Sequence, residues 1–94
     1  PGLVATVGQL EVRPGAGNVI PGAATLSLDV RHQDDAARLA AVEAIRARVA
    51  AIAAARGVSL SWEELQRTAA VPMAPGLRAR LAAAMAACGL RPFE

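Results

Sequence analysis

The segment from Asp34 to Gly57 has the pattern of one long amphipathic helix, and it constrains the fold more than any other feature. Acidic residues open it, where the helix dipole favours negative charge, and Arg56 followed by a glycine is typical of a helix end. Between these ends, apolar residues recur at spacings of three and four and form one stripe: Leu39, Val42, Ile45, Val49 and Ile52. We therefore predict a helix that packs through a single face.

Three shorter segments alternate between apolar and polar residues, which is the period of a half-buried β-strand. They are residues 3–13, 24–31 and 58–63. The order β-β-α-β predicts a mixed α/β fold, in part a ferredoxin-like antiparallel sheet with the helix on one face. A complete version of that fold has another helix before Leu3, so we expect the chain to be a segment of a larger protein.

A second helix is predicted at residues 77–88, after a loop that carries Pro72 and Pro75. Its apolar side ends at Cys88, which is the single cysteine of the chain. We expect this cysteine to be packed in the interior of a protein from a reducing compartment, the cytoplasm. Residues 90–94 are compatible with the start of a further strand.

The composition excludes several classes of function. The chain has 94 residues and is 54% hydrophobic, much of it alanine, with one tryptophan and one phenylalanine. Its formal charge is +2, and all 10 basic residues are arginines spread along the chain, which does not indicate a nucleic-acid site. The apolar stretches are too short to span a bilayer. We therefore expect a small folded domain that binds neither nucleic acid nor membranes.

Few residues of the sequence could carry out catalysis. His32 is the only histidine, and no pair of histidines or cysteines has the spacing of a zinc site. The acidic pairs at 34–35 and 63–64 are better explained by a helix start and a solvated strand end than by acid–base chemistry. We therefore assign no catalytic residue and no metal-binding residue to this chain.

One polar pair is a candidate binding site. Asn18 lies in the proline- and glycine-rich loop at 14–22, and Arg31 lies on the polar face of the strand that follows. A guanidinium can bind a carboxylate through two hydrogen bonds, and an amide can both donate and accept. The alternative is structural: Asn18 takes a left-handed turn conformation, and Arg31 pairs with Asp29. The residues alone favour this structural interpretation.

The same region resembles a known enzyme family. The segments are Val-Gly-Gln-Leu-Glu-Val at 7–12, Pro-Gly-Ala-Gly-Asn-Val-Ile-Pro-Gly at 14–22 and Leu-Ser-Leu-Asp-Val-Arg at 26–31. They resemble the dimerisation domain of allantoate amidohydrolases, N-carbamoyl-L-amino-acid hydrolases and β-ureidopropionase-like enzymes, within the dinuclear-zinc aminoacylase and carboxypeptidase superfamily. The resemblance covers essentially the whole chain, and the Asn-Val-Ile-Pro-Gly loop with the later Asp-Val-Arg is its most specific part.

The resemblance implies a homodimeric amidohydrolase with two zinc or manganese ions, which cleaves a ureido or carbamoyl C–N bond of a small acidic substrate. It implies that residues 1–70 are the lid or dimerisation domain and that residues 71–94 return to the catalytic domain. Asn18 and Arg31 would bind the substrate's carboxylate and nearby polar groups, in some members across the dimer interface. The metal ligands would lie outside this chain. The alternative is a free-standing ferredoxin-like interaction or small-ligand module without catalysis.

Overall fold

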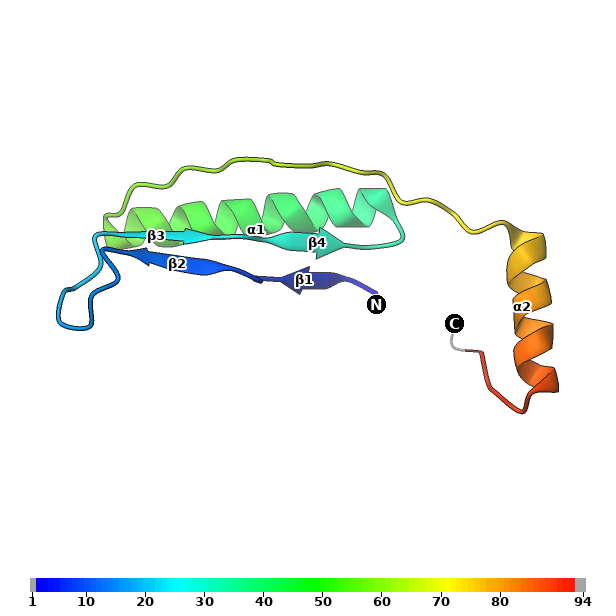
Figure 1. The fold of residues 1–94 in the computed structure, drawn as a ribbon. Helices are drawn as coiled ribbons and strands as arrows, with labels where there is room; N and C mark the ends of the chain where they lie inside the picture. Colours follow the sequence, from blue (N-terminus) through cyan, green and yellow to red (C-terminus); the bar gives the residue numbers. More distant parts are fainter. Residues whose placement is uncertain (1, 93–94) are drawn as a thin grey trace.

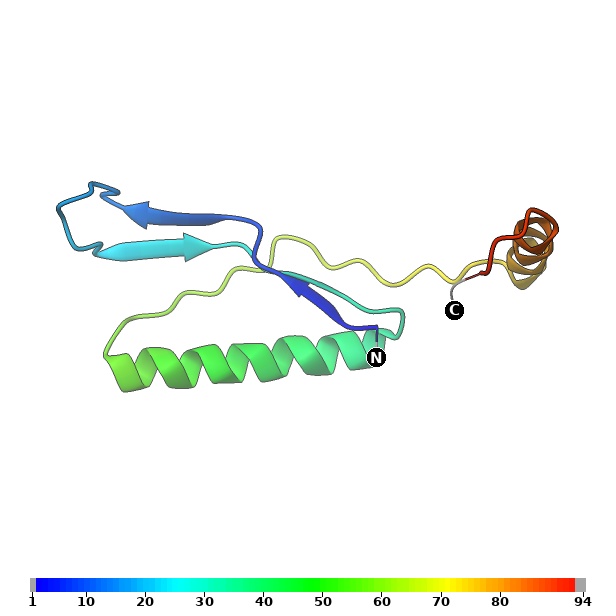
Figure 2. The ribbon, with the colours of Figure 1, turned by 90° about the horizontal axis from the view of Figure 1, so that it is seen from below.

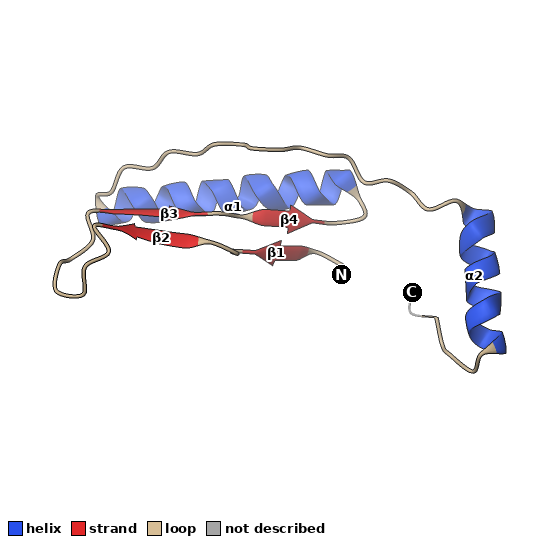
Figure 3. Ribbon diagram, in the orientation of Figure 1, coloured by secondary structure: helices blue, strands red, loops and turns tan. Residues whose placement is uncertain are grey.

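The computed structural model of the chain describes residues 2–92, and Figure 1 shows their arrangement. In chain order the elements are β1 (Val4–Thr6), β2 (Leu10–Arg13), β3 (Ala23–Leu26), β4 (Asp29–Arg31), α1 (Asp35–Arg56) and α2 (Pro75–Ala87). The strands pair antiparallel, α1 runs along them, and α2 stands apart (Figure 3). The predicted mixed α/β fold, with an antiparallel sheet and a helix on one face, is confirmed.

The two long predicted strands form one hairpin that is interrupted at its middle. β1 pairs with β4, and the last pair of this ladder is Thr6 with Asp29. β2 pairs with β3, and the first pair of this ladder is Leu10 with Leu26. The first strand therefore has one more residue between the ladders than the second, which is the signature of a β-bulge.

The interruption stays hydrogen-bonded. The Ser27 amide donates to the Gln9 carbonyl at 3.1 Å, and the Gln9 amide donates to the Ser27 hydroxyl at 3.0 Å. A bulge bends the strand that carries it and increases the local twist. This accounts for Figure 2, in which the β2–β3 hairpin diverges from α1 while β1 and β4 remain near it.

α1 begins and ends where the sequence predicted. Asp34 caps its N-terminus, because the Asp34 carboxylate accepts hydrogen bonds from the amides of Ala36 and Ala37 at 2.8 and 3.2 Å. Gly57 ends the helix with a φ of 67°, in the left-handed region that favours glycine. Both signals lie within a few residues of the helix end that they set, which is why the sequence was sufficient to place them.

The face of α1 that lies toward the strands also follows the predicted period. Its less exposed residues recur at spacings of three and four, and they include Leu39, Val42, Ile45, Val49 and Ala53. Ile52 was predicted to belong to this face, but its side chain is 45% exposed. Val30 of β4 is half-buried where β4 contacts α1.

The strand predicted at residues 58–63 does not form. Residues 58–70 are extended but pair with no strand, and they run back along α1 (Figure 1). The guanidinium of Arg46 lies over the Trp62 ring, 5.6 Å from its centroid, and the Ala70 amide donates to both carboxylate oxygens of Asp35 at 3.2 Å. Alternating residues favour an extended chain, but a strand also requires a neighbouring edge. Here the free edge of β4 lies across an open groove.

The described residues bury little of their surface. Ala53, which is 8% exposed, is the only buried hydrophobic residue among them, and the exposed area is 8352 Å². A compact monomer of this mass exposes roughly 5,100 Å². The radius of gyration is 19.9 Å, whereas a compact chain of this length has about 12 Å. The α/β unit therefore leaves much apolar surface open to solvent.

α2 begins two residues earlier than predicted and contacts no other helix or strand among residues 2–92. Cys88, which was predicted to be buried, is therefore exposed. The strand expected at residues 90–94 has not begun by residue 92, and residues 93–94 lie outside the described residues. No helix in the described part of the chain has the length and apolarity needed to cross a membrane. The domain boundary after residue 70 stays a prediction.

Candidate functional site

Arg31 ends β4 and extends into solvent from the sheet. Its Nε and Nη2 atoms donate to the two carboxylate oxygens of Asp29 at 2.8 and 3.2 Å. The hydrogen bond from Arg31 lowers the pKa of Asp29, and the same bond raises the pKa of Arg31. Both side chains are therefore charged at neutral pH. The ion pair of the structural interpretation is present, and it holds the guanidinium in one orientation.

One face of the sheet forms a shallow hollow around this ion pair, with a volume of about 400 Å³. The hollow is lined by Val4, Thr6, Gly8, Ser27, Asp29 and Arg31. In the paired strands these are every second residue, so they share one face, and Val30 on the opposite face lies toward α1. A guanidinium has five N–H donors, of which two bond to Asp29. The other donors can bind a carboxylate that enters from solvent.

Asn18 lies in the loop that joins β2 to β3. It occupies a turn in which the Val19 amide donates to the Ala16 carbonyl at 3.3 Å. Among the described residues only glycines have a positive φ, so the left-handed conformation predicted for Asn18 is wrong. A turn that closes between residues three apart tolerates asparagine without that conformation.

Asn18 and Arg31 do not meet within one chain. The loop that carries Asn18 lies at one end of the hairpin, and β4 lies toward the other end (Figure 1). From Ala23, where β3 begins, to Arg31 the chain advances 8 residues, roughly 26 Å in an extended strand. A small substrate cannot span this distance. If both residues contact one substrate molecule, they must come from two copies of the chain.

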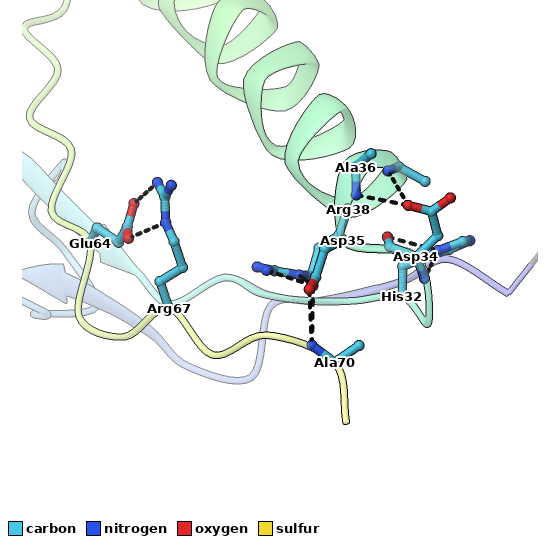
Figure 4. A network of polar contacts seen from close by, with 9 residues as sticks. His32, Asp34, Asp35, Ala36, Arg38, Glu64, Arg67 and Ala70 are labelled. Atoms are coloured by element: carbon cyan, nitrogen blue, oxygen red, sulfur yellow. Dashed lines mark hydrogen bonds and ion pairs between the residues drawn. The ribbon is translucent and has the colours of Figure 1, made fainter. Parts of the chain in front are cut away.

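His32 and the acidic residues beside it have structural partners. The Asp34 amide donates to Nδ1 of His32 at 2.9 Å, which closes the turn between β4 and α1. Glu64 binds Arg67 through two bonds of 2.7 Å (Figure 4). In residues 2–92, no group of three or more His, Cys, Asp and Glu side chains could hold a metal ion. The interpretation of the acidic pair at 34–35 as a helix start is confirmed, because Asp34 caps α1.

A second and larger hollow was not predicted. It is an open groove of about 840 Å³, bounded by residues 26–32, by residues 61–70 and by the N-terminal half of α1. Asp35 anchors one end, because its carboxylate accepts hydrogen bonds from both Arg38 and the Ala70 amide (Figure 4). Asp35 and Ala70 are 35 residues apart, so no local spacing in the sequence could have indicated this contact.

We predict that acid releases the extended segment from α1. Hydrogen bonds from Arg38 and from the Ala70 amide lower the pKa of Asp35 below its ordinary value of 3.8. A carboxylate with a lowered folded-state pKa stabilises its contacts above the unfolded pKa, and this stabilisation is lost as the pH falls through the folded value. In an NMR titration, the Ala70 amide should therefore shift with a midpoint below pH 3.8. Asp35→Asn should abolish the shift and Glu43→Gln should not; a shift that persists in Asp35→Asn would contradict the contact.

The chain is similar over most of its length to several hydrolases. It is 35% identical over 74 residues to the N-carbamoyl-L-amino-acid amidohydrolase of Paenarthrobacter aurescens, covering 79% of this chain and 18% of that protein. It is 37% identical over 82 residues to the allantoate deiminase of Arabidopsis thaliana, covering 87% and 16%. It is 44% identical over 68 residues to the N-carbamoyl-L-amino acid amidohydrolase of Geobacillus stearothermophilus, covering 72% and 17%. The chain is a relative of the allantoate deiminases and N-carbamoyl-L-amino-acid amidohydrolases.

These matches confirm the resemblance that the loop and strand motifs indicated. The chain spans less than a fifth of the length of these relatives, between 16% and 18%. No protein-family model and no solved structure matches it. The binding roles of Asn18 and Arg31 stay predictions.

Proposed function

We propose that this chain is a substrate-binding and dimerising segment of a cytoplasmic amidohydrolase. The enzyme cleaves a ureido or carbamoyl C–N bond of a small acidic substrate, allantoate or an N-carbamoyl amino acid. The observation that carries this proposal is the similarity over 68 to 82 residues to proteins named for those two activities.

Arg31 binds the substrate's carboxylate in this proposal. Its side chain is 78% exposed at the edge of the hollow, and Asp29 holds the guanidinium in one orientation before the substrate arrives. Pre-orientation reduces the rotamer entropy that is lost on binding. The paired hydrogen bonds of a guanidinium suit a carboxylate better than a single ammonium does.

Asn18 of a second copy completes the same site. Two observations support a homodimer of this kind. Asn18 and Arg31 lie too far apart in one chain for one small ligand, and the described residues leave much apolar surface exposed. A twofold axis that brings the loop of each copy to β4 of the other creates two equivalent sites.

The described residues do not fit the two zinc or manganese ions that the whole enzyme is expected to use. They contain no cluster of His, Cys, Asp and Glu side chains suited to a metal. We therefore assign the metal ligands and the bond-breaking groups to other parts of the enzyme. This segment contributes binding and orientation of the substrate.

The second candidate function is a free-standing interaction or small-ligand module without catalysis. One observation favours it: the groove between β4 and residues 61–70 is open and could receive a partner. This alternative needs neither a metal site nor a second domain.

Assays on the full-length protein that contains this segment separate the two functions. We expect hydrolysis of allantoate or of N-carbamoyl amino acids that falls to background when a chelator removes the metal and returns when zinc or manganese is added. The 94-residue chain alone should not hydrolyse either substrate. Metal-independent hydrolysis by the isolated chain would contradict the proposal, and a full-length protein that is inactive on both substrates would favour the module.

A further inference from the structure

The hollow at Arg31 extends along the sheet beyond the guanidinium. Its lining residues form three rows across the two strands: Val4 with Arg31, Thr6 with Asp29, and Gly8 with Ser27. The Arg31 side chain bends back along its strand, since its Nε and Nη2 atoms bond to Asp29 in the middle row. Ser27 lies one row further, two residues or roughly 6.6 Å along the strand. A carboxylate at Arg31 therefore leaves the row of Gly8 and Ser27 for another part of the same ligand.

The bulge between the two ladders fixes the Ser27 hydroxyl in this row. In a regular antiparallel pair, the backbones of Gln9 and Ser27 would exchange two hydrogen bonds. Here the Ser27 amide donates to the Gln9 carbonyl at 3.1 Å, but the Gln9 amide donates at 3.0 Å to the Ser27 hydroxyl and not to the Ser27 carbonyl. Ser27 is half-buried, while the other lining residues of the hollow are exposed. The bulge thus holds this side chain in one orientation, as bulges beside functional sites do.

The Ser27 hydroxyl has a proton to donate to a ligand. A hydroxyl has one donor and two acceptor positions, and one of the acceptor positions receives the Gln9 amide. Among residues 2–92, no side chain or backbone oxygen accepts the proton. A half-buried donor of this kind is stabilised by an acceptor that enters the hollow.

Gly8 keeps the space beside this hydroxyl open. Its φ is not positive, so the backbone conformation does not require glycine here. A methyl group at this position would meet the Ser27 Oγ at 3.9 Å, which is an ordinary contact. Neither conformation nor packing within the described part of the chain accounts for the glycine. A side chain at residue 8 would instead occupy the space from which a ligand approaches the Ser27 hydroxyl.

Charges already in the hollow favour an uncharged group beside Ser27. The Asp29 carboxylate and the Arg31 guanidinium form an ion pair with 2.8 Å between Oδ1 and Nε. The substrate's carboxylate adds one negative charge to this neutral pair. A second carboxylate one row away would be repelled by the first and by Asp29. The hydroxyl therefore suits a neutral acceptor, such as a carbonyl oxygen.

We propose that Ser27 and Gly8 select allantoate over N-carbamoyl amino acids that have small or apolar side chains. The inference rests on the proposed function, in which Arg31 binds the substrate's carboxylate. Allantoate has two ureido groups on the carbon that carries its carboxylate. Groups outside this chain cleave one of them, and the other lies in the row of Gly8 and Ser27, where its carbonyl oxygen accepts the Ser27 proton.

The dimensions of allantoate agree with this placement. The ureido carbonyl carbon is three bonds from the carboxylate carbon, about 3.8 Å, the same as between consecutive Cα atoms. A hydrogen bond of about 2.9 Å at each end extends this reach beyond the spacing of one row. One molecule can therefore contact the Arg31 guanidinium and the Ser27 hydroxyl together.

Steady-state kinetics of the full-length enzyme on two substrates test the proposal. N-carbamoylglycine has the carboxylate and the cleaved group of allantoate, but hydrogen replaces the second ureido group. The native enzyme should have the higher kcat/KM for allantoate. Ser27→Ala should lower this value about twofold to tenfold, as expected for one neutral hydrogen bond, and should leave the value for N-carbamoylglycine unchanged. Ser27→Thr keeps the hydroxyl and should keep the native ratio of the two values.

Gly8→Ala tests the open space and should lower kcat/KM for allantoate alone. Gly22→Ala is the matched control and should change neither value. Gly22 also lacks a positive φ, and a methyl group there would meet no atom within 4 Å, but it lies outside the hollow. Native kcat/KM for allantoate in Gly8→Ala would overturn the role of Gly8.

The two substrates separate failure of this inference from failure of the proposed function. An equal loss on both substrates in Ser27→Ala would mean that the hydroxyl contacts the carboxylate or only holds the bulge, and it would overturn selection by Ser27. A native enzyme that hydrolyses N-carbamoylglycine but not allantoate would also overturn the inference, while the proposed function would stand. Hydrolysis of neither substrate would overturn the proposed function and this inference with it.

Discussion

Two inactive variants of the full-length enzyme, Asn18→Ala and Arg31→Ala, should restore each other's activity when they are co-expressed. The loop that carries Asn18 and the strand that ends at Arg31 lie at opposite ends of one hairpin. In the proposed dimer, each site therefore takes one residue from each copy. In a mixed dimer, one site then receives both substituted residues and the other receives both native ones. Random association makes half of the dimers mixed, so we expect about a quarter of the wild-type activity.

Activity of the co-expressed mixture, measured beside each variant alone, checks this result. Co-expression of Arg31→Ala with Arg31→Gln is the matched control and should restore nothing, because no site then has a native arginine. Mixed dimers that form, as seen by native mass spectrometry, but show no recovery would mean that one chain supplies both residues. An enzyme that is monomeric at assay concentrations would also contradict the shared site.

Arg31→Lys should lower kcat/KM for the carboxylate substrate by about tenfold to a hundredfold, mainly through KM, since hydrogen bonds to charged groups contribute about 1.5–3 kcal/mol. Lysine keeps the positive charge but loses the planar fork. It can neither bond to both oxygens of Asp29 nor present further donors in a fixed direction. The loss therefore reflects geometry and not charge, and steady-state kinetics measure it.

Arg13→Lys is the matched control for this substitution. Arg13 is also exposed and also pairs with an acid two residues earlier, Glu11, at 3.4 Å, but it lies on β2 outside the hollow. Its replacement should leave KM unchanged. A substrate analogue with an amide in place of the carboxylate should be hydrolysed equally poorly by the native and Arg31→Lys enzymes. Equal losses in Arg13→Lys and Arg31→Lys would contradict a specific role for Arg31.

The two residues of the proposed site were visible in the sequence, but their spatial relation was not. Residue types and family motifs singled out Asn18 and Arg31, and the pairing of Arg31 with Asp29 was foreseen from their spacing along one strand. The residue types alone suggested one joint binding site, and the family resemblance implied that in some members such a site lies across the dimer interface. Extended chain between Ala23 and Arg31 separates them, which is why we propose a site shared by two copies.

For the extended segment after α1, the sequence predicted the backbone conformation but not its contacts. Alternation at residues 58–63 indicated an extended backbone, and the backbone is extended. It is not a strand, because pairing depends on which edge lies within hydrogen-bonding reach. Asp35 and Arg46 instead hold the segment along α1, at Ala70 and at Trp62. These contacts join residues far apart in the chain, and neither has a local signature.

The sequence by itself determined α1, with both of its ends, and the family to which the chain is related. Helix caps, the helical period and the motif residues each involve positions that lie close together in the sequence, so they can be recognised from the sequence alone. Only the tertiary structure decided that a bulge splits the hairpin into two ladders, that Cys88 is exposed, and that an open groove lies beside β4. Each of these features depends on contacts between residues that are far apart in the sequence. The local sequence pattern does not determine such contacts, and this chain, which buries little of its surface, makes few of them.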